Sequence, residues 1–158
     1  MAMDVLLETA RCTVRLFQPE DAAALHEVLS DPAVMRYIEP PYTLPQTREF
    51  IRTAGLCDPP LVYAVEERAT NDLIGHLICH PFDDGRWELG WVLRRDRWGQ
   101  GLAGELTEAL IAHARRSSVD ALVIECAAAQ TVTHHIAEGF GFRRLADAPL
   151  LLYELRLN

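Results

Sequence analysis

The segment from Arg86 to Cys126 constrains the fold of this chain more than any other, because it joins two strand patterns through a glycine-rich turn and a helix. Arg86–Leu93 alternates as a strand does. One face of this strand carries Trp87, Leu89, Trp91 and Leu93, and the other carries Glu88, Gly90 and Val92. Leu102–Arg116 has helical spacing, and Ala121–Cys126 is a short apolar run typical of a buried strand. This order predicts a crossover between two parallel strands.

Strand and helix patterns also fill the rest of the chain. Further strands are predicted at residues 12–17, 61–67, 73–80, 140–145 and 150–157. Helices are predicted at residues 19–30, 32–38, 43–56 and 131–138. No internal repeat or long linker interrupts this order. We therefore expect a single mixed α/β (α+β) domain over residues 1–158, with one parallel crossover near its middle.

Charge and cysteine content exclude several functional classes. The net charge is −8, and all 15 basic residues are arginine, which argues against a nucleic-acid partner or a polybasic membrane segment. No apolar run approaches the roughly 18 residues that span a bilayer, and the N-terminal segment lacks the basic stretch of a secretory signal. Neither the cysteines nor the histidines have metal-ligand spacing. We expect a cytoplasmic protein with reduced cysteines, no metal and no membrane partner. The four cysteines are Cys12, Cys57, Cys79 and Cys126.

The glycine-rich turn before the central helix has the composition of an anion site. Gly99, Gly101 and Gly104 permit close approach of the backbone to a ligand. The first N–H groups of the following helix lack internal partners, and the helix dipole is positive there. Arg94, Arg95 and Arg97 precede the turn and add local positive charge in an acidic protein. This combination favours a phosphate-bearing ligand.

Two other interpretations of the turn remain open from the residues alone. The three glycines spell the GxGxxG pattern of dinucleotide-binding folds, and Glu125 follows at about the 20-residue interval that this pattern expects. The pattern lies in mid-chain, however, and not after a first strand. The turn also has a purely structural explanation as a tight strand-to-helix connection. A P-loop is excluded because no GxxxxGK[ST] sequence occurs.

Several motifs together resemble the GNAT N-acetyltransferases, in the branch of the bacterial ribosomal-protein N-terminal acetyltransferases (RimJ/RimL type). The strand ELGWVL and the turn WGQGLAG resemble their acetyl-CoA loop, with Trp98 in place of the usual Arg or Gln. RLFQPEDAAAL, DPAVMRY and EGFGFRR match further signatures in the same order along nearly the whole chain. The resemblance implies a GNAT fold, in which a mostly antiparallel sheet with a splayed parallel pair is flanked by helices.

The same resemblance implies where acetyl-CoA binds. The strand would offer backbone groups to the pantetheine arm, and the amides of the turn would hold the pyrophosphate. Gln130 stands where the family often has an Asn that touches the coenzyme A arm, and a backbone N–H of residues 91–93 would stabilise the oxyanion. The predicted cofactor-binding residues are Trp91, Val92, Leu93, Arg94, Arg97, Trp98, Gly99, Gln100, Gly101, Leu102, Ala103, Gly104 and Gln130.

The reaction implied is direct attack of a primary amine, either a protein N-terminus or a small amine, on the acetyl thioester. Glu88 matches a strand carboxylate that serves as general base in several members, acting through a water. An equally simple interpretation is a solvent-facing strand glutamate or an ion-pair partner. The last helix carries Ala137 where many members have a general-acid Tyr, so Thr133, near the sulfur, is the substitute candidate.

The segment around residue 40 lines the acceptor site in related proteins, so Tyr37, Glu39 and Tyr42 are candidate acceptor residues. A rigid surface turn at Pro40–Pro41 explains the same residues without a functional role. Two rival functions remain, an acyl-CoA-binding domain without catalysis and a nucleotide-binding oxidoreductase. The sequence leaves a monomer and a homodimer equally open, and it does not identify the acceptor.

Overall fold

A computed structural model describes residues 4–146 and 150–157 of the chain, which form one eight-stranded sheet in the order β1-β2-β3-β4-β5-β6-β8-β7. Every neighbouring pair is antiparallel except β5 and β6, which are parallel. The strands are β1 (Val5–Glu8), β2 (Cys12–Arg15), β3 (Val62–Glu67), β4 (Leu73–Asp83), β5 (Arg86–Leu93), β6 (Ala121–Cys126), β7 (Arg143–Ala146) and β8 (Leu151–Arg156). The structure confirms the predicted mixed α/β fold with its single parallel pair.

In the described part of the chain five α-helices flank this sheet: α1 (Ala22–Leu29), α2 (Pro32–Met35), α3 (Leu44–Phe50), α4 (Leu102–Arg115) and α5 (Thr131–Gly139). Side-chain hydrogen bonds cap the N-termini of two of the short helices. The Asp31 carboxylate accepts a hydrogen bond from the Ala33 amide at the start of α2, and Thr43 forms a capping box with Gln46 at the start of α3. A π-helical turn, residues 51–55, continues α3, so the helix expected over residues 43–56 is confirmed with a change of pitch.

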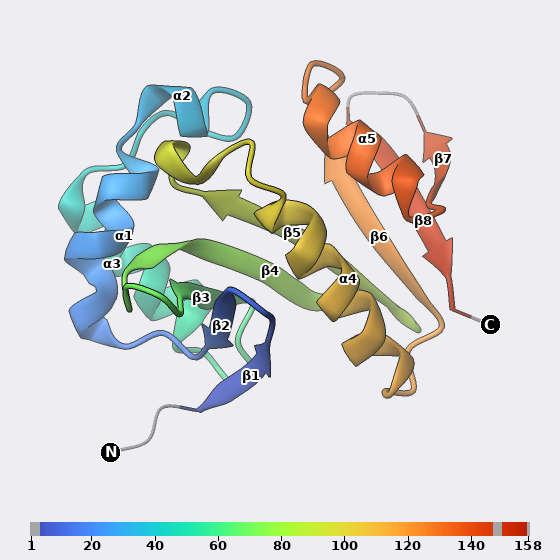
Figure 1. Cartoon of the computed structure of the whole chain (residues 1–158), viewed down its shortest axis with the longest axis horizontal. Helices are drawn as coiled ribbons and strands as arrows, with labels where there is room; N and C mark the ends of the chain where they lie inside the picture. The colour runs from blue at the N-terminus through green and yellow to red at the C-terminus, as the bar shows by residue number, and fades with distance from the viewer. Residues whose placement is uncertain (1–3, 147–149, 158) are drawn as a thin grey trace.

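The parallel pair of strands separates along its length. β5 and β6 pair only at their first three positions, and the last pair joins Glu88 to Val123. Beyond it the strands diverge, and Figure 1 shows them as the two arms of a V that opens toward their carboxyl ends. The splayed pair that the family resemblance implied is therefore present, and it separates immediately after the candidate base.

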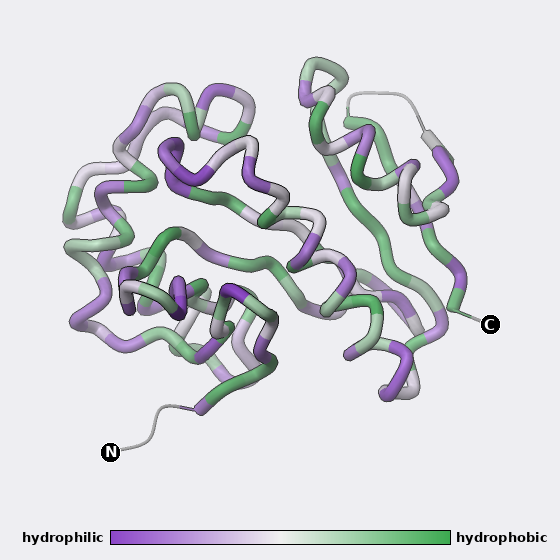
Figure 2. Tube along the Cα trace, viewed as in Figure 1, coloured by the Kyte–Doolittle hydropathy of each residue, from purple (hydrophilic) through white to green (hydrophobic). Residues whose placement is uncertain are grey.

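The two faces of the sheet carry two separate cores. Strand alternation sends Leu89 and Leu93 into the core beneath α4 and α5, whereas Val92 belongs to the core beneath α1, α2 and α3. Figure 2 shows apolar residues running along β6 and the neighbouring strands, with hydrophilic residues at the outer turns. The last two strands confirm the predicted closing pair, although β7 begins three residues later than expected because Phe140 ends α5.

Strand β1 was not predicted from the sequence. Val5–Glu8 has only four residues, lies at the edge of the sheet and pairs with β2 alone. Its sequence, VLLE, does not alternate between apolar and polar residues, so no strand pattern marks it. Its pairing therefore comes from tertiary context, and the turn that joins it to β2 contributes to the site described next.

Candidate active site

The turn before α4 has a backbone that only glycine adopts readily. Gly99 and Gly101 have φ values of +72° and +80°, which lie in the left-handed region. Gly101 is the N-cap of α4, and no side chain caps this helix end. The open amides of the first turn and the helix dipole therefore face outward beside the end of β5, as an anion site requires.

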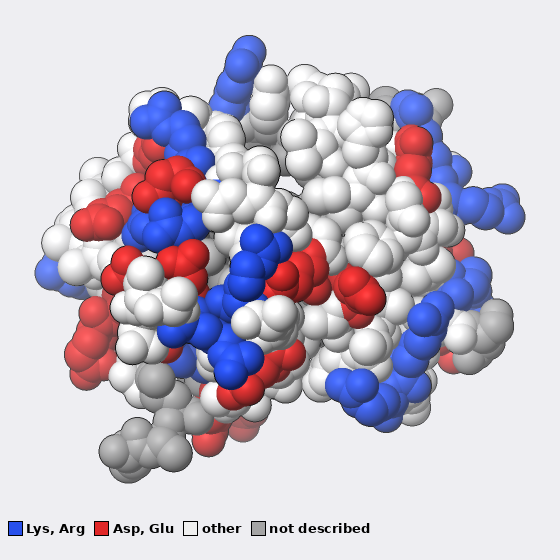
Figure 3. Space-filling view, viewed as in Figure 1, with Lys and Arg blue, Asp and Glu red and all other residues white. Residues whose placement is uncertain are grey.

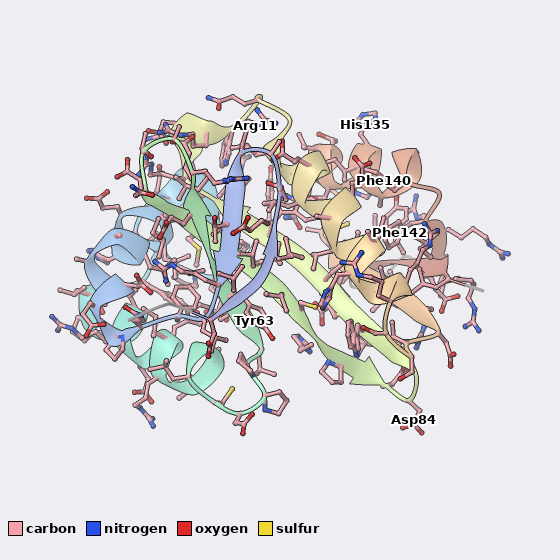
Figure 4. The ribbon with its side chains drawn as sticks, turned by 60° about the horizontal axis from the view of Figure 1, so that its bottom comes forward. Arg11, Tyr63, Asp84, His135, Phe140 and Phe142 are labelled. Atoms are coloured by element: carbon pink, nitrogen blue, oxygen red, sulfur yellow. The ribbon has the colours of Figure 1, made fainter. Side chains whose placement is uncertain are left out.

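Arg11, in the turn between β1 and β2, supports the glycine turn from outside. Its Nη1 donates to the backbone oxygen of Gln100 at 2.8 Å, and its Nε donates to Glu105 of α4 at 2.8 Å. Glu105 also accepts hydrogen bonds from the Arg11 amide and from Thr9. Figure 4 shows Arg11 at the tip of the β1–β2 hairpin. Arg11 was not among the predicted site residues, because β1 itself was not predicted.

The structure revises the expected role of the arginine cluster. Arg97 makes two hydrogen bonds to Glu67, at 2.9 and 3.0 Å. Arg94 pairs with Asp96 at 2.7 Å and Arg95 with Asp31 at 3.0 Å. Three carboxylates thus balance the three guanidinium groups, and Figure 3 shows positive and negative side chains interleaved over this part of the surface. Attraction of an anion to the turn then depends mainly on backbone amides and the helix dipole.

Trp98 ties the turn to the strand that precedes it. Its indole Nε1 donates to the backbone oxygen of Leu93 at 3.0 Å, and its side chain remains half exposed, at 49%. Trp98 therefore differs from Trp87 and Trp91, which pack against the core. The bond to Trp98 occupies one lone pair of the Leu93 carbonyl, which is among the backbone groups predicted to meet the pantetheine arm.

A cavity of about 490 Å³ opens where β5 and β6 separate. One wall is β5 from Glu88 to Val92, and the opposite wall is the end of β6 and the start of α5. This volume is in the range of small-molecule sites. The predicted residues that line it are Glu88, Trp91, Val92, Gln130, Thr133, Tyr37, Glu39 and Tyr42. The other predicted residues, from Leu93 through the glycine turn, lie outside this cavity and form the adjacent helix end.

Glu88 is half-buried in the wall of the cavity. Burial raises the pKa of its carboxyl group above the usual value, and the nearby Glu125 raises it further, while His80 acts in the opposite direction. His80 Nε2 lies 3.6 Å from Glu88 Oε1, and His80 Nδ1 lies 2.8 Å from the backbone oxygen of Pro81. A carboxylate with a raised pKa in a cavity is a stronger base than a free glutamate, as a proton acceptor requires.

The loop between β6 and α5 supplies the facing wall. The Gln130 side-chain oxygen accepts a hydrogen bond from the Ala127 amide at 2.7 Å, which leaves its NH₂ group as the donor available to a ligand. Thr133 is partly exposed and lines the cavity. His134 has a structural role, because its ring nitrogens lie 2.7 Å from the Tyr153 hydroxyl and 3.1 Å from the backbone oxygen of Ala128.

The segment before α3 forms the third wall of the cavity. The Tyr42 hydroxyl donates to Glu39 at 2.7 Å, and burial together with this bond raises the pKa of Tyr42 to about 12. Tyr42 also packs edge-on against Phe50. Tyr37 is 41% exposed and belongs to the rim. The structure therefore brings all three candidate acceptor residues to the same cavity as Glu88 and Thr133.

His76 on β4 is a cavity residue that the sequence analysis did not single out. The side chain is 5% exposed, and its Nδ1 has no hydrogen-bond partner in the described part of the chain. Burial lowers the pKa of His76 to about 4, so the ring is neutral near pH 7. A histidine within an apolar strand pattern gives no signal of this kind, because its partners come from other elements.

The low pKa of His76 predicts a pH-dependent stability. Below pH 6.5 the unfolded chain binds a proton at this residue, and the folded chain does not until about pH 4. As the pH is lowered through this window, the free energy of unfolding should therefore decrease, by up to about 1.4 kcal/mol per pH unit. In His76→Phe this contribution is absent. Chemical denaturation of both proteins at pH 7, 5.5 and 4.5 tests it, and an equal fall in both would contradict the assignment.

Comparison with known proteins identifies the family. A family model described as an acetyltransferase (GNAT) domain matches residues 11–143. The chain belongs to the GNAT acetyltransferase family. The matched region includes β5, the glycine turn, α4, β6 and α5, so the adjacent helix end and all of the cavity lining except Leu150 lie within it.

Relatives and solved structures agree with this assignment. The GNAT domain is 26% identical over 142 residues to the uncharacterized N-acetyltransferase YnaD of Bacillus subtilis, which covers 87% of this chain and 82% of YnaD. A GNAT-family acetyltransferase from Bacillus anthracis matches with a TM-score of 0.86 at 25% identity, over 96% of this chain and 98% of that one. The ribosomal-protein alpha-N-acetyltransferase RimL, in complex with coenzyme A, matches with a TM-score of 0.82 at 18% identity, over 97% and 98%. The fold of the RimJ/RimL branch, implied by the sequence motifs, is confirmed.

The GNAT fold removes one rival interpretation of the glycines. In a dinucleotide-binding fold, GxGxxG follows the first strand of a parallel unit. Here the glycines follow the fifth strand of a mostly antiparallel sheet. The oxidoreductase interpretation is therefore wrong. Over residues 4–146 and 150–157, no helix is long and apolar enough to cross a membrane, and no three His, Cys, Asp or Glu side chains are grouped as a metal site.

Proposed function

We propose that this GNAT protein transfers the acetyl group of acetyl-CoA to a primary amine, and that the acceptor is a protein N-terminus or a small amine. The observation that carries the proposal is the cavity where β5 and β6 separate, because it places Glu88 and Thr133 in one space beside the N-terminus of α4. A pyrophosphate on that helix end would leave the thioester of the pantetheine arm to enter between the two strands. RimL, which shares the fold, acts on a ribosomal protein and binds coenzyme A, and this supports a protein N-terminus as one of the two acceptor classes.

The proposed chemistry needs no covalent intermediate with the protein. The neutral amine attacks the carbonyl carbon, the C–N bond forms, the C–S bond breaks, and coenzyme A leaves as a thiolate that takes up a proton. Glu88 accepts the proton of the ammonium through a water, and its raised pKa suits this role. A backbone N–H of residues 91–93 would stabilise the oxyanion. Thr133 would place its hydroxyl near the departing sulfur.

The decisive experiment is an acceptor screen with a thiol readout. Purified protein is mixed with acetyl-CoA and a panel of peptides and small amines, and free coenzyme A is measured with a thiol reagent. Thiol release that depends on an amine supports the proposal. Coenzyme A binding without release would support the rival function, an acyl-CoA-binding domain without catalysis. No binding at millimolar coenzyme A would contradict both.

Thr133→Val should lower kcat by roughly tenfold, because it replaces one hydrogen-bonding hydroxyl with a methyl group of similar size. The affinity for acetyl-CoA should change less than about twofold, because a lost leaving-group contact affects the transition state more than the ground state. Steady-state kinetics and calorimetric titration measure the two quantities. Val132→Thr, at an exposed position of the same helix, is the matched control. An unchanged kcat in Thr133→Val would remove Thr133 from the mechanism.

A further inference from the structure

The wall of the cavity formed by β4 contains a buried polar group with unmet hydrogen-bonding capacity. His76 is the one side chain in the described ranges with a fully buried nitrogen that lacks a partner. Its ring lies against Phe50, with 5.1 Å between ring centroids. Leaving such a group unpaired destabilises the folded state, and buried polar groups in native proteins are nearly always paired. A ligand that fills the cavity is the natural partner.

The sheet register places His76 apart from the candidate base. His76 pairs with Val92 of β5, whereas His80 pairs with Glu88. Paired residues of an antiparallel sheet project from the same face, and four residues along a strand correspond to about 13 Å. His76 is therefore further along the cavity from Glu88. It lies beside Val92, whose backbone is predicted to meet the pantetheine arm. It is too far from Glu88 to share its proton.

The surroundings of His76 select the kind of group that it can bind. The nearby lining is apolar and comes from four elements, through Leu29, Phe50, Val62 and Ile78. Such a wall cannot solvate an ion, so a charged substituent would be rejected. A neutral imidazole offers one donor and one acceptor. Hydroxyl and amide groups are the neutral chemistry that matches both.

We propose that His76 is a specificity-determining residue that hydrogen-bonds a neutral hydroxyl or amide on the substituent next to the acceptor's amine. This inference rests on the proposed function, because it needs the cavity to hold the acceptor. Glu39 and Glu88 then supply negative charge for the amine itself, at the other walls of the same cavity. The acceptor is a primary amine with a short, uncharged, hydrogen-bonding side chain.

The test compares acceptors that differ by one hydroxyl. One pair of peptides begins with serine or with 2-aminobutyrate, which carries a methyl group in place of the hydroxyl. Ethanolamine and propylamine make the same comparison among small amines. For the natural protein, kcat/KM should favour the hydroxyl member by about tenfold or more, since the analogue leaves His76 unpaired. In His76→Phe this ratio should fall to about one.

Two further variants separate recognition from folding. His76→Gln keeps a neutral donor and acceptor and should restore part of the preference. His80→Phe, on the same face of β4, should keep the full ratio even where the overall rate falls. The melting temperature of His76→Phe at pH 7 should equal or exceed that of the natural protein, because an unpaired polar group is replaced by an apolar ring next to Phe50.

The outcomes distinguish this inference from the function on which it rests. A tenfold preference that disappears in His76→Phe supports the inference. The inference is overturned if the preference survives in His76→Phe, or if both members of a pair lose rate equally. In either case His76 would not recognise the hydroxyl of the acceptor. If the natural protein acetylates no amine at all, the proposed function itself fails.

Discussion

Replacing Gly101 with glutamate is expected to weaken coenzyme A binding by about 100-fold or more. Gly101 caps the N-terminus of α4 with φ +80°, and an added Cβ there would lie 3.6 Å from Arg11 Nη2, at the helix end where the pyrophosphate is proposed to bind. Two like charges about 5 Å apart at an effective dielectric of about 20 repel each other by roughly 3 kcal/mol, which corresponds to about 100-fold in affinity. Calorimetric titration with coenzyme A measures the effect, and circular dichroism checks that the fold is retained.

Two controls divide this effect into strain and charge. Gly101→Ala imposes the same left-handed backbone on a non-glycine residue without adding charge, and should weaken binding by less than about tenfold. Gly139→Glu adds the same charge at the end of α5, where no atom lies within 4 Å of the added Cβ, and should bind coenzyme A normally. Natural affinity in Gly101→Glu would show that the anion site lies elsewhere.

Glu88→Gln is expected to lower kcat by about 100-fold, the usual range for removal of a general base. The acetyl-CoA affinity should not change, because the carboxylate acts on the amine and not on the cofactor. The pH profile carries the stronger evidence. Only the ionised carboxylate accepts a proton, so the rate should rise with pH through the pKa of Glu88, which burial and Glu125 raise above the usual range. In Glu88→Gln this rise of the rate with pH should vanish. Only the rise caused by deprotonation of the amine substrate should remain.

Glu125→Gln is the matched control for this profile. Glu125 lies on the neighbouring strand β6 and raises the pKa of Glu88. Removing the Glu125 charge should therefore move the pH-dependent rise of the rate to lower pH. His80, on β4, lowers the pKa of Glu88, so His80→Phe should move the pH-dependent rise of the rate to higher pH. Identical profiles in the natural protein and Glu88→Gln would remove Glu88 as the base.

The local elements of the site were predictable because each depends on a short stretch of sequence. The bounds of β5 and β6 agree with prediction at every residue, since alternation and an apolar run are properties of the segments themselves. The glycines of the turn indicated a backbone close to a ligand, and two of them do have positive φ values. The start of α4 at Leu102 follows from the same turn.

The partners of individual side chains were not predictable in this way. The arginines before the turn were expected to add local positive charge, and their carboxylate partners were not foreseen: Arg97 is paired with Glu67, 30 residues away. Arg11 reaches Glu105 across 94 residues, through a hairpin whose edge strand has no alternating sequence pattern. Such pairs depend on the path of the whole chain, which no local pattern contains.

The sequence by itself determined the crossover, the glycine turn, the candidate base and the family motifs, because these follow from the sterics and periodicity of contiguous residues. Only the tertiary structure decided that β5 and β6 part immediately after Glu88, and that Tyr37, Glu39 and Tyr42 lie across the same cavity. It alone showed that His76 is buried without a partner for its Nδ1. Burial and hydrogen bonding are set by elements distant in the sequence, and the folded sheet is what brings those elements together.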